Sequence, residues 1–172
     1  NICPMLVDTV ALTVDQPINY SLRVDRTEMC ATDAKGFSFK VDSLTAKPGS
    51  MTWSNGATGD SLHVVPAQSE TISVKVTSLN NLCPSVTKSA SVNVYEPLAV
   101  KNILSRDSVC LGDTVKMAVS LTSGIAGSYS WDDGMTDSSV TVSAKDKPYV
   151  VSVRSYHNIC PMLVDTFKLI VD

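Results

Sequence analysis

The sequence is poor in the residue types on which most catalytic and nucleic-acid-binding sites depend. Charged residues make up 18% and aromatic residues 6% of the 172 residues, and there are two histidines. The net charge of −3 and the pI near 5.3 exclude a basic surface that follows a phosphate backbone. No Ser-His-Asp arrangement and no glycine-rich phosphate loop is indicated. We therefore expect no enzyme, no cofactor and no nucleic-acid partner.

Long apolar runs and helical patterns are also missing. No apolar run approaches the roughly 18 residues that a membrane-spanning helix needs, so we expect no membrane insertion. The first residues lack the basic and apolar regions of a signal peptide. An extracellular protein shown without its signal begins in this way, and so does a fragment of a longer chain. No segment of ten or more residues keeps a 3.6-residue period, whereas Ser, Thr and Val are abundant, which predicts an all-β protein.

What the sequence does contain is an internal repeat with a period of 77–80 residues. The residues around each landmark match in kind, for example TWSNGAT with SWDDGMT and VKVTSLNNLCP with VSVRSYHNICP. The landmarks are Cys30 and Cys110, 80 residues apart; Trp53 and Trp131, 78 apart; and Cys83 and Cys160, 77 apart.

The same period explains why the nonamer NICPMLVDT occurs both at Asn1–Thr9 and at Asn158–Thr166. Cys3 lies 80 residues before Cys83, so we interpret residues 1–16 as the last strand of a preceding copy. Two full copies follow, at residues 17–96 and 97–172. The identity of the two nonamers, 157 residues apart, indicates a two-domain super-repeat within a longer array.

Each copy offers five to seven short segments in which apolar and polar residues alternate, separated by turn signals such as Ser-Asn-Gly and Asp-Asp-Gly. Alternation indicates sheets with one buried face, hence antiparallel sheets. We predict tandem small antiparallel β-sandwiches of the Ig-like kind, with Trp53 and Trp131 in the cores. The linkers YEPLAV and VDQPIN are short, which favours a semi-stiff array.

Five cysteines fit this repeat as a disulfide framework. Each full copy has one cysteine before its second strand and one before its last strand. We therefore predict the pairs Cys30–Cys83 and Cys110–Cys160, with Cys3 unpaired in this chain. Disulfides indicate an oxidising compartment, so we expect an extracellular or cell-surface protein. A metal site is not favoured, because there is no CxxC motif and the two histidines are scattered.

The segments WSNGATGDSL and WDDGMTDSSV are the most distinctive ones. The structural interpretation is a strand with a core Trp followed by a tight turn, because Asn or Asp before Gly adopts the left-handed conformations of such turns. The functional alternative is a calcium site formed by Asp132, Asp133 and Asp137. The first copy has Ser54 and Asn55 at the places of the first two aspartates, so only the second copy would bind calcium.

A further pattern is Asp followed by Ser or Thr and then an aliphatic residue. It resembles the O-glycosylation acceptor pattern of exported proteins of Bacteroidota, which implies sugars on exposed hydroxyls. The alternative is that Asp-Ser and Asp-Thr simply suit junctions between turns and strands. The candidate acceptors are Thr9, Ser43, Ser61, Ser108 and Thr114.

The segment WSNGATGDSLHVVPAQSETISVKVTSLNNLCP, with its Trp strand, S-N/D-G-x-T turn, alternating hairpin and late Cys, resembles the Ig-like and PKD-like repeats of Bacteroidota surface proteins. Those include large adhesins and gliding-motility filament proteins exported by the type IX secretion system. The resemblance covers both full copies. The Trp is not followed by the W-x-F-G-D-G of a PKD domain, so the choice between PKD-like and Ig-like stays open. The resemblance implies non-catalytic modules strung in series.

The first hypothesis is thus a structural and adhesive module in a long extracellular array, whose partners are neighbouring repeats of the same chain and surface glycans or other cells. A second hypothesis is a self-assembling filament subunit, in which residues 1–16 complete the sandwich of another subunit by strand addition and Cys3 pairs across chains.

A third hypothesis is a carbohydrate-binding accessory domain of a secreted enzyme, which needs an exposed aromatic platform. Trp53, Trp131, Phe37 and Phe39 fall mostly on expected core faces. The remaining platform candidates are Tyr20, Tyr95, Tyr129, Tyr149 and Tyr156.

Overall fold

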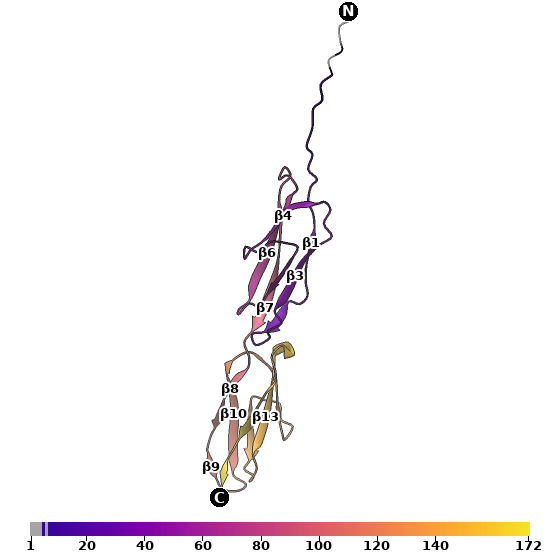
Figure 1. Cartoon of the computed structure of the whole chain (residues 1–172). Helices are drawn as coiled ribbons and strands as arrows, with labels where there is room; N and C mark the ends of the chain where they lie inside the picture. Colours follow the sequence, from indigo (N-terminus) through magenta and orange to yellow (C-terminus); the bar gives the residue numbers. More distant parts are fainter. Residues whose placement is uncertain (1–4, 6) are drawn as a thin grey trace, which may run out of the picture. The chain divides into compact units, whose positions relative to one another are not determined.

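The computed structural model describes Met5 and residues 7–172, and its regular elements are almost entirely strands (Figure 1). In chain order they are β1 (Ser21–Val24), β2 (Glu28–Cys30), β3 (Phe37–Asp42), β4 (Pro48–Trp53), β5 (Ser61–Val64), β6 (Glu70–Ser78), β7 (Val86–Tyr95), β8 (Ala99–Leu104), β9 (Ser108–Val109), β10 (Thr114–Ser123), β11 (Ala126–Trp131), β12 (Ser139–Ser143), β13 (Tyr149–Ser155), the short 3₁₀ helix η1 (Tyr156–Asn158), β14 (Leu163–Phe167) and β15 (Ile170–Val171). The all-β prediction is confirmed. No helix in the described part of the chain is long and apolar enough to cross a membrane.

The chain divides into two compact units, each made of several segments. The first contains the described residues up to Asp25 together with Ser38–Leu62 and Thr71–Ala90. The second contains Arg26–Phe37, His63–Glu70 and Ser91–Asp172.

Strands β1–β7 form two sheets, of order β1-β3-β5 and β2-β7-β6-β4. The pairs β1–β3 and β4–β6 are antiparallel, whereas the short β2 runs parallel to the end of β7. In β3 the alternate residues Phe37, Phe39 and Val41 are buried, as the period of two predicts. Phe39 meets Trp53 of β4 edge to face, with ring centroids 6.1 Å apart.

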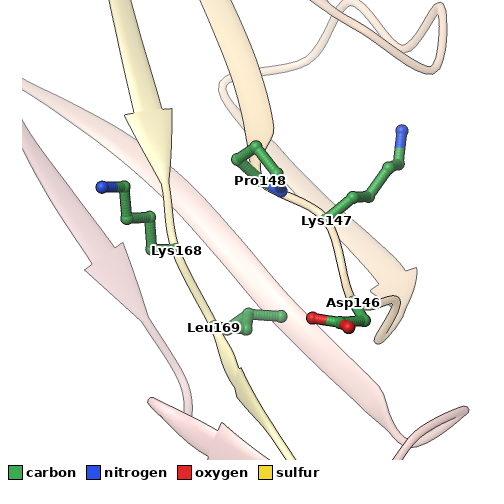
Figure 2. Close-up of a pocket in the computed structure, with 5 residues that line it drawn as sticks. All are labelled: Asp146, Lys147, Pro148, Lys168 and Leu169. Carbon is green, nitrogen blue, oxygen red and sulfur yellow. The ribbon is translucent and has the colours of Figure 1, made fainter.

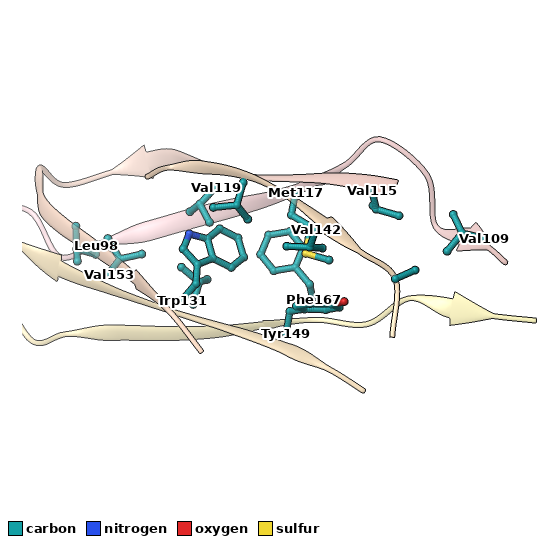
Figure 3. Packing of buried hydrophobic residues seen from close by; sticks show 13 residues of the cluster. Leu98, Val109, Val115, Met117, Val119, Trp131, Val142, Tyr149, Val153 and Phe167 are labelled. Carbon is teal, nitrogen blue, oxygen red and sulfur yellow. The ribbon is translucent and has the colours of Figure 1, made fainter. Parts of the chain in front are cut away.

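Strands β8–β15 form the sheets β12-β10-β8 and β11-β13-β14, both antiparallel, and the parallel pair β15-β9. Their inner faces enclose one apolar cluster, in which Trp131 and Phe167 lie 5.3 Å apart (Figure 3). Val115, Met117 and Val119 of β10 repeat the buried alternation of β3. Every strand pairing among the described residues falls within β1–β7 or within β8–β15. The copy boundaries at residues 16 and 96 stay a prediction.

Both tryptophan segments form the same turn, which agrees with the structural interpretation of that motif. The indole Nε1 of Trp53 donates to the Gly59 carbonyl at 2.9 Å, and that of Trp131 donates to the Asp137 carbonyl at 2.8 Å. The glycine of each turn, Gly56 or Gly134, has a φ near +85°, where a side chain would be strained. The repeated sequence therefore builds a buried Trp and the turn that seals it.

The last strand of the repeat has a different structure at each of its three occurrences. In the first full copy it is β7, and in the second it is split into β14 and β15, which pair with β13 and β9. The predicted last strand of a preceding copy has no strand structure in its described residues 7–16. Its apolar residues Val10, Leu12 and Val14 are exposed, so the assignment of residues 1–16 to a preceding copy stays a prediction.

Candidate functional site

The most distinctive local arrangement is a disulfide between Cys30 and Cys160, which are 130 residues apart in sequence. The predicted pairs Cys30–Cys83 and Cys110–Cys160 were wrong, because Cys83 and Cys110 are free thiols. Both bonded cysteines are buried, whereas Cys83 is half-buried and Cys110 exposed. The predicted state of Cys3 lies outside the described residues. The disulfide thus links the early cysteine of one sequence copy to the late cysteine of the next.

The length of a copy's last strand explains why its two cysteines do not pair. Cys30 lies opposite Tyr95, at the far end of β7, whereas Cys83 precedes the start of that strand at Val86. Ten extended residues span about 30 Å, far more than the 4.4–6.8 Å between the Cα atoms of a disulfide. The same holds for Cys110 and Cys160, which lie at opposite ends of the segment containing β14 and β15.

A buried serine holds each late cysteine in place. The backbone N–H of Cys160 donates to Ser155 Oγ at 2.9 Å, and Ser155 Oγ donates to the Cys160 carbonyl at 2.7 Å. Ser78 receives the equivalent hydrogen bond from the N–H of Cys83 at 3.1 Å. We call each such loop, residues 78–83 and 155–160, a cysteine corner. The aligned segments SLNNLCP and SYHNICP contain both serines, each five residues before its cysteine, so the repeat itself carries the signal for this corner.

The backbone carbonyl of Tyr95, the last residue of β7, lies close to both cysteines of the disulfide or their neighbours. The N–H of Ala31, next to Cys30, donates to it at 2.8 Å, and Cys160 Sγ lies 3.4 Å from it. The Tyr95 side chain donates to Glu28 Oε1 at 3.0 Å, and this carboxylate raises the pKa of the phenol. The Tyr95 ring lies 6.3 Å from that of Tyr156, which stacks on His157. Tyr95 therefore contacts the disulfide through its backbone and Glu28 and Tyr156 through its side chain.

Asp15 occupies the corresponding place at the other cysteine corner. Cys83 Sγ lies 3.6 Å from the Asp15 carbonyl oxygen, as Cys160 lies beside that of Tyr95. The Asp15 carboxylate accepts hydrogen bonds from the Ser78 hydroxyl at 2.7 Å, from Asn80 and from the Leu82 N–H. These donors, Ser78 foremost, lower the pKa of Asp15 from 3.8 to about 2. Asp15 is not among the residues for which the sequence pattern predicted a role.

The structure does not bring the candidate calcium ligands together. Asp132 forms an ion pair with Lys147 at 2.9 Å, and this hydrogen bond lowers the pKa of the carboxyl group. Asp133 Oδ1 accepts the N–H of Met135 within the turn, and Asp137 contributes its backbone carbonyl to Trp131. No group of three His, Cys, Asp or Glu residues able to hold a metal ion occurs in the described part of the chain.

The candidate glycosylation acceptors and platform tyrosines divide by exposure. All five candidate acceptors are exposed: Thr9, Ser43, Ser61, Ser108 and Thr114. Tyr20 and Tyr149 are buried and donate to backbone carbonyls, so they offer no platform. Tyr95 and Tyr129 are half-buried, and Tyr156 is exposed. Glycosylation stays a prediction.

Several hollows among the described residues are open to solvent. The one shown in Figure 2 is lined by Asp146, Lys147, Pro148, Lys168 and Leu169. Its two lysine side chains point away from each other, so they do not converge on a common ligand (Figure 2). Lys147 is engaged by Asp132 and lies over the ring of Tyr149 at 5.5 Å. The arrangement offers a modest charged surface and no nucleophile with its base.

Comparison with known proteins identifies the fold. No family model matches the sequence, and no curated protein matches it. Among solved structures, murine CEACAM1b is similar at 10% identity, with 90% of this chain and 100% of that chain covered and a TM-score of 0.53. The C-terminal 282-residue fragment of intimin, in complex with the intimin-binding domain of the translocated intimin receptor, is similar at 11% identity, with 90% and 64% covered and a TM-score of 0.56. A chain from the complex of the mouse coronavirus receptor-binding domain with its murine receptor is similar at 8% identity, with 90% of this chain and 100% of that chain covered and a TM-score of 0.55. The chain therefore has the fold of tandem Ig-like domains.

Proposed function

We propose that the chain is a non-catalytic extracellular repeat module that forms part of a long surface adhesin or filament stalk. The observation that carries this proposal is that the features shared by both copies are structural ones. The indole-to-carbonyl bonds of Trp53 and Trp131 and the serine-held cysteine corners recur with nearly the same distances. All of these features stabilise the fold. The polar surface differs between the copies, as expected when no shared catalytic site constrains it.

Three further observations support this role. The buried disulfide suits an oxidising compartment outside the cell. The intimin fragment with the similar fold was solved bound to its receptor's domain, which supports a place on a cell surface. The exposure of all five Asp-Ser/Thr acceptors fits the glycosylated surface proteins of Bacteroidota that the repeats resemble, which are exported by the type IX system. Glycans and other cells are the partners that such a protein would contact.

The stalk role is tested by displaying the chain on a cell with one, two or four units in series and an epitope at the outer end. Units are joined in register by following Asp172 with Gln16, since Asp172 is the counterpart of Asp15 in the 157-residue super-repeat. We expect the height of the epitope above the membrane to rise in steps with each added unit. Fluorescence interference microscopy measures that height.

The matched control is an unrelated tandem Ig-like pair of the same length, which should give similar steps. A height that does not grow with the number of units would contradict the stalk role. Saturable adhesion to other cells by the displayed chain, absent from the control, would place the adhesive surface in these domains rather than in another part of the protein.

A second candidate function, the filament subunit, is favoured by one observation. Val10 and Leu12 are 91% and 85% exposed, on a segment whose counterpart forms β14 and β15 in the second copy. Such an alternating segment can add to the sheet edge of another molecule. Sedimentation velocity of the chain, of a Leu12→Asp variant and of residues 16–172 tests this. Concentration-dependent assembly that both changes abolish supports a filament, and a monomer throughout contradicts it.

A further inference from the structure

We propose that Cys83 and Cys110 are halves of two further disulfides of the Cys30–Cys160 kind, so that every copy of the repeat is covalently bonded to the next. Cys110 pairs with the late cysteine of the following copy, and Cys83 pairs with the early cysteine of the preceding copy. This proposal rests on the proposed function, because it requires further copies in the same chain.

At the Cys30–Cys160 disulfide, which we call the junction, the last residue of a strand lies between an early cysteine on one side and a late cysteine on the other. Each of these two sides, or halves, occurs once more elsewhere in the chain without the other. At the observed junction, Tyr95 O accepts from Ala31 N, beside Cys30, and lies against Cys160 Sγ. The early half recurs at Asp172, whose carbonyl accepts from Leu111 N, beside Cys110, at 3.2 Å. The strand pairs β2–β7 and β9–β15, which place these early cysteines, are both parallel.

The late half recurs at Asp15, whose carbonyl lies 3.6 Å from Cys83 Sγ. Asp15 and Asp172 are counterparts in the 157-residue super-repeat and carry the same side chain. An aspartate at that place, with a cysteine corner on one side and an early cysteine on the other, reproduces the surroundings of Tyr95. The corner at residues 78–83 already holds the aspartate through Ser78, Asn80 and Leu82.

The sequence separation gives a further argument. In two units joined in register, Cys110 of the first and Cys83 of the second are separated by the same 130 residues as Cys30 and Cys160. Cys83 is half-buried and Cys110 exposed, so both thiols are accessible to an oxidant. The alternative, a bond within one copy, is opposed by the length of the last strand, as it is for Cys30 and Cys83.

The chemistry is thiol–disulfide exchange. The two thiols lose two protons and two electrons and form one S–S bond, and a disulfide oxidant of the glutathione-disulfide or oxidoreductase class accepts the electrons and leaves as two thiols. The resulting loops overlap along the array, because each begins before the previous one has closed. Unfolding one copy would then release little chain length under tension, which suits a stalk.

The test uses residues 1–172 followed directly by residues 16–172 in one polypeptide, refolded with a mixture of reduced and oxidised glutathione. After alkylation and non-reducing digestion, mass spectrometry should find Cys110 of the first unit bonded to Cys83 of the second. Both Cys30–Cys160 bonds should be present as well. Cys110→Ser in the first unit should leave the second unit's Cys83 alkylated, whereas Cys83→Ser in the first unit should leave the new bond intact.

Recovery of both junction cysteines in alkylated form, or bonded to any other cysteine or to another molecule, would overturn the proposal. The near-ultraviolet circular dichroism of the same sample separates this failure from failure of the proposed function. Two folded, unlinked tandem units would leave the stalk role standing. An unfolded or aggregated second unit in the Cys110→Ser variant alone would support the bond, because folding would then depend on it.

Discussion

Residues 7–15 and 164–172 occupy the same position of the repeat, begin with the same letters and have different structures. The second segment contains parts of β14 and β15, and Phe167 within it is 2% exposed. Its counterpart Val10 is 91% exposed in a segment without strand structure. The difference shows that local sequence alone does not make this strand. Pairing with β13 and burial against Trp131 do.

The two cysteine corners make a second comparison. The corner of Cys160 is bonded to Cys30, while the corner of Cys83 has a free thiol, yet in both corners the N–H of the cysteine donates to the serine Oγ. The cysteine corner therefore forms whether or not its cysteine is in a disulfide. We expect equivalent positions in the two copies to differ in how much they contribute to stability, as follows.

The largest effect is expected from removing the disulfide. The double variant Cys30→Ser/Cys160→Ser opens a loop of 130 residues, which the chain-entropy model values at about 5 kcal/mol of unfolding free energy. The matched variant Cys83→Ser/Cys110→Ser removes two free thiols and should change stability by less than about 0.5 kcal/mol. Urea denaturation under non-reducing conditions compares the two.

The same pair of variants can be pulled from the chain ends in an optical trap. Opening the loop should add roughly 450 Å of contour length on full unfolding, at about 3.5 Å for each of the 130 residues. Equal contour lengths for the two double variants would show that the bond to Cys160 does not form.

The next largest effect concerns the repeated last strand. Phe167→Ala removes a buried ring from the core around Trp131 and should cost about 3–5 kcal/mol. Val10→Ala, at the equivalent position, should change the unfolding free energy by no more than about 0.5 kcal/mol, because Val10 is exposed. Guanidinium denaturation measures both. A comparable loss for Val10→Ala would mean that residues 7–15 pack in solution.

A smaller effect is expected at the corner serines. Ser155→Ala leaves the N–H of Cys160 without its acceptor, which costs about 1–3 kcal/mol, and Ser78→Ala should cost a similar amount at Cys83. Similar losses in thermal unfolding would show that the corner is independent of the disulfide. A loss confined to Ser155→Ala would show instead that the bond organises the corner.

The smallest effect is the pH dependence from Asp15. Its folded-state pKa, about 2, lies below the ordinary value of 3.8, so the ionised form is favoured in the fold. The contribution of Asp15 is therefore complete above about pH 4 and is lost as the pH falls towards 2. The stability difference between the natural chain and Asp15→Asn should shrink over that window. Asp8→Asn, whose carboxylate accepts only from its neighbour Thr9 among the hydrogen bonds described, serves as the control, and a constant difference would contradict the prediction.

The sequence was sufficient to predict the β fold, the buried tryptophans and their turns. The alternation of apolar and polar residues around Phe37, Phe39 and Val41 directly indicates a buried face of a sheet. Asn or Asp before Gly indicates the turn after each Trp. These are local signals, and each copy carries its own.

The cysteine pairing could not be predicted in the same way. A sequence repeat shows which cysteines are equivalent but not which are neighbours in space. Because each copy contains two cysteines, the repeat led us to predict a disulfide within each copy. The deciding quantity is the length of β7, which separates Cys30 from Cys83. The role of Asp15 was hidden for a related reason, since its partners Ser78 and Leu82 lie more than 60 residues away.

The Cys30–Cys160 bond joins the early cysteine of one copy to the late cysteine of the next, instead of two cysteines of the same copy. Its most direct test is a non-reducing peptide map of the oxidised chain after alkylation of free thiols. We predict a Cys30–Cys160 peptide pair, with Cys83 and Cys110 alkylated. A map that instead shows Cys30 bonded to Cys83 and Cys110 bonded to Cys160 would contradict it.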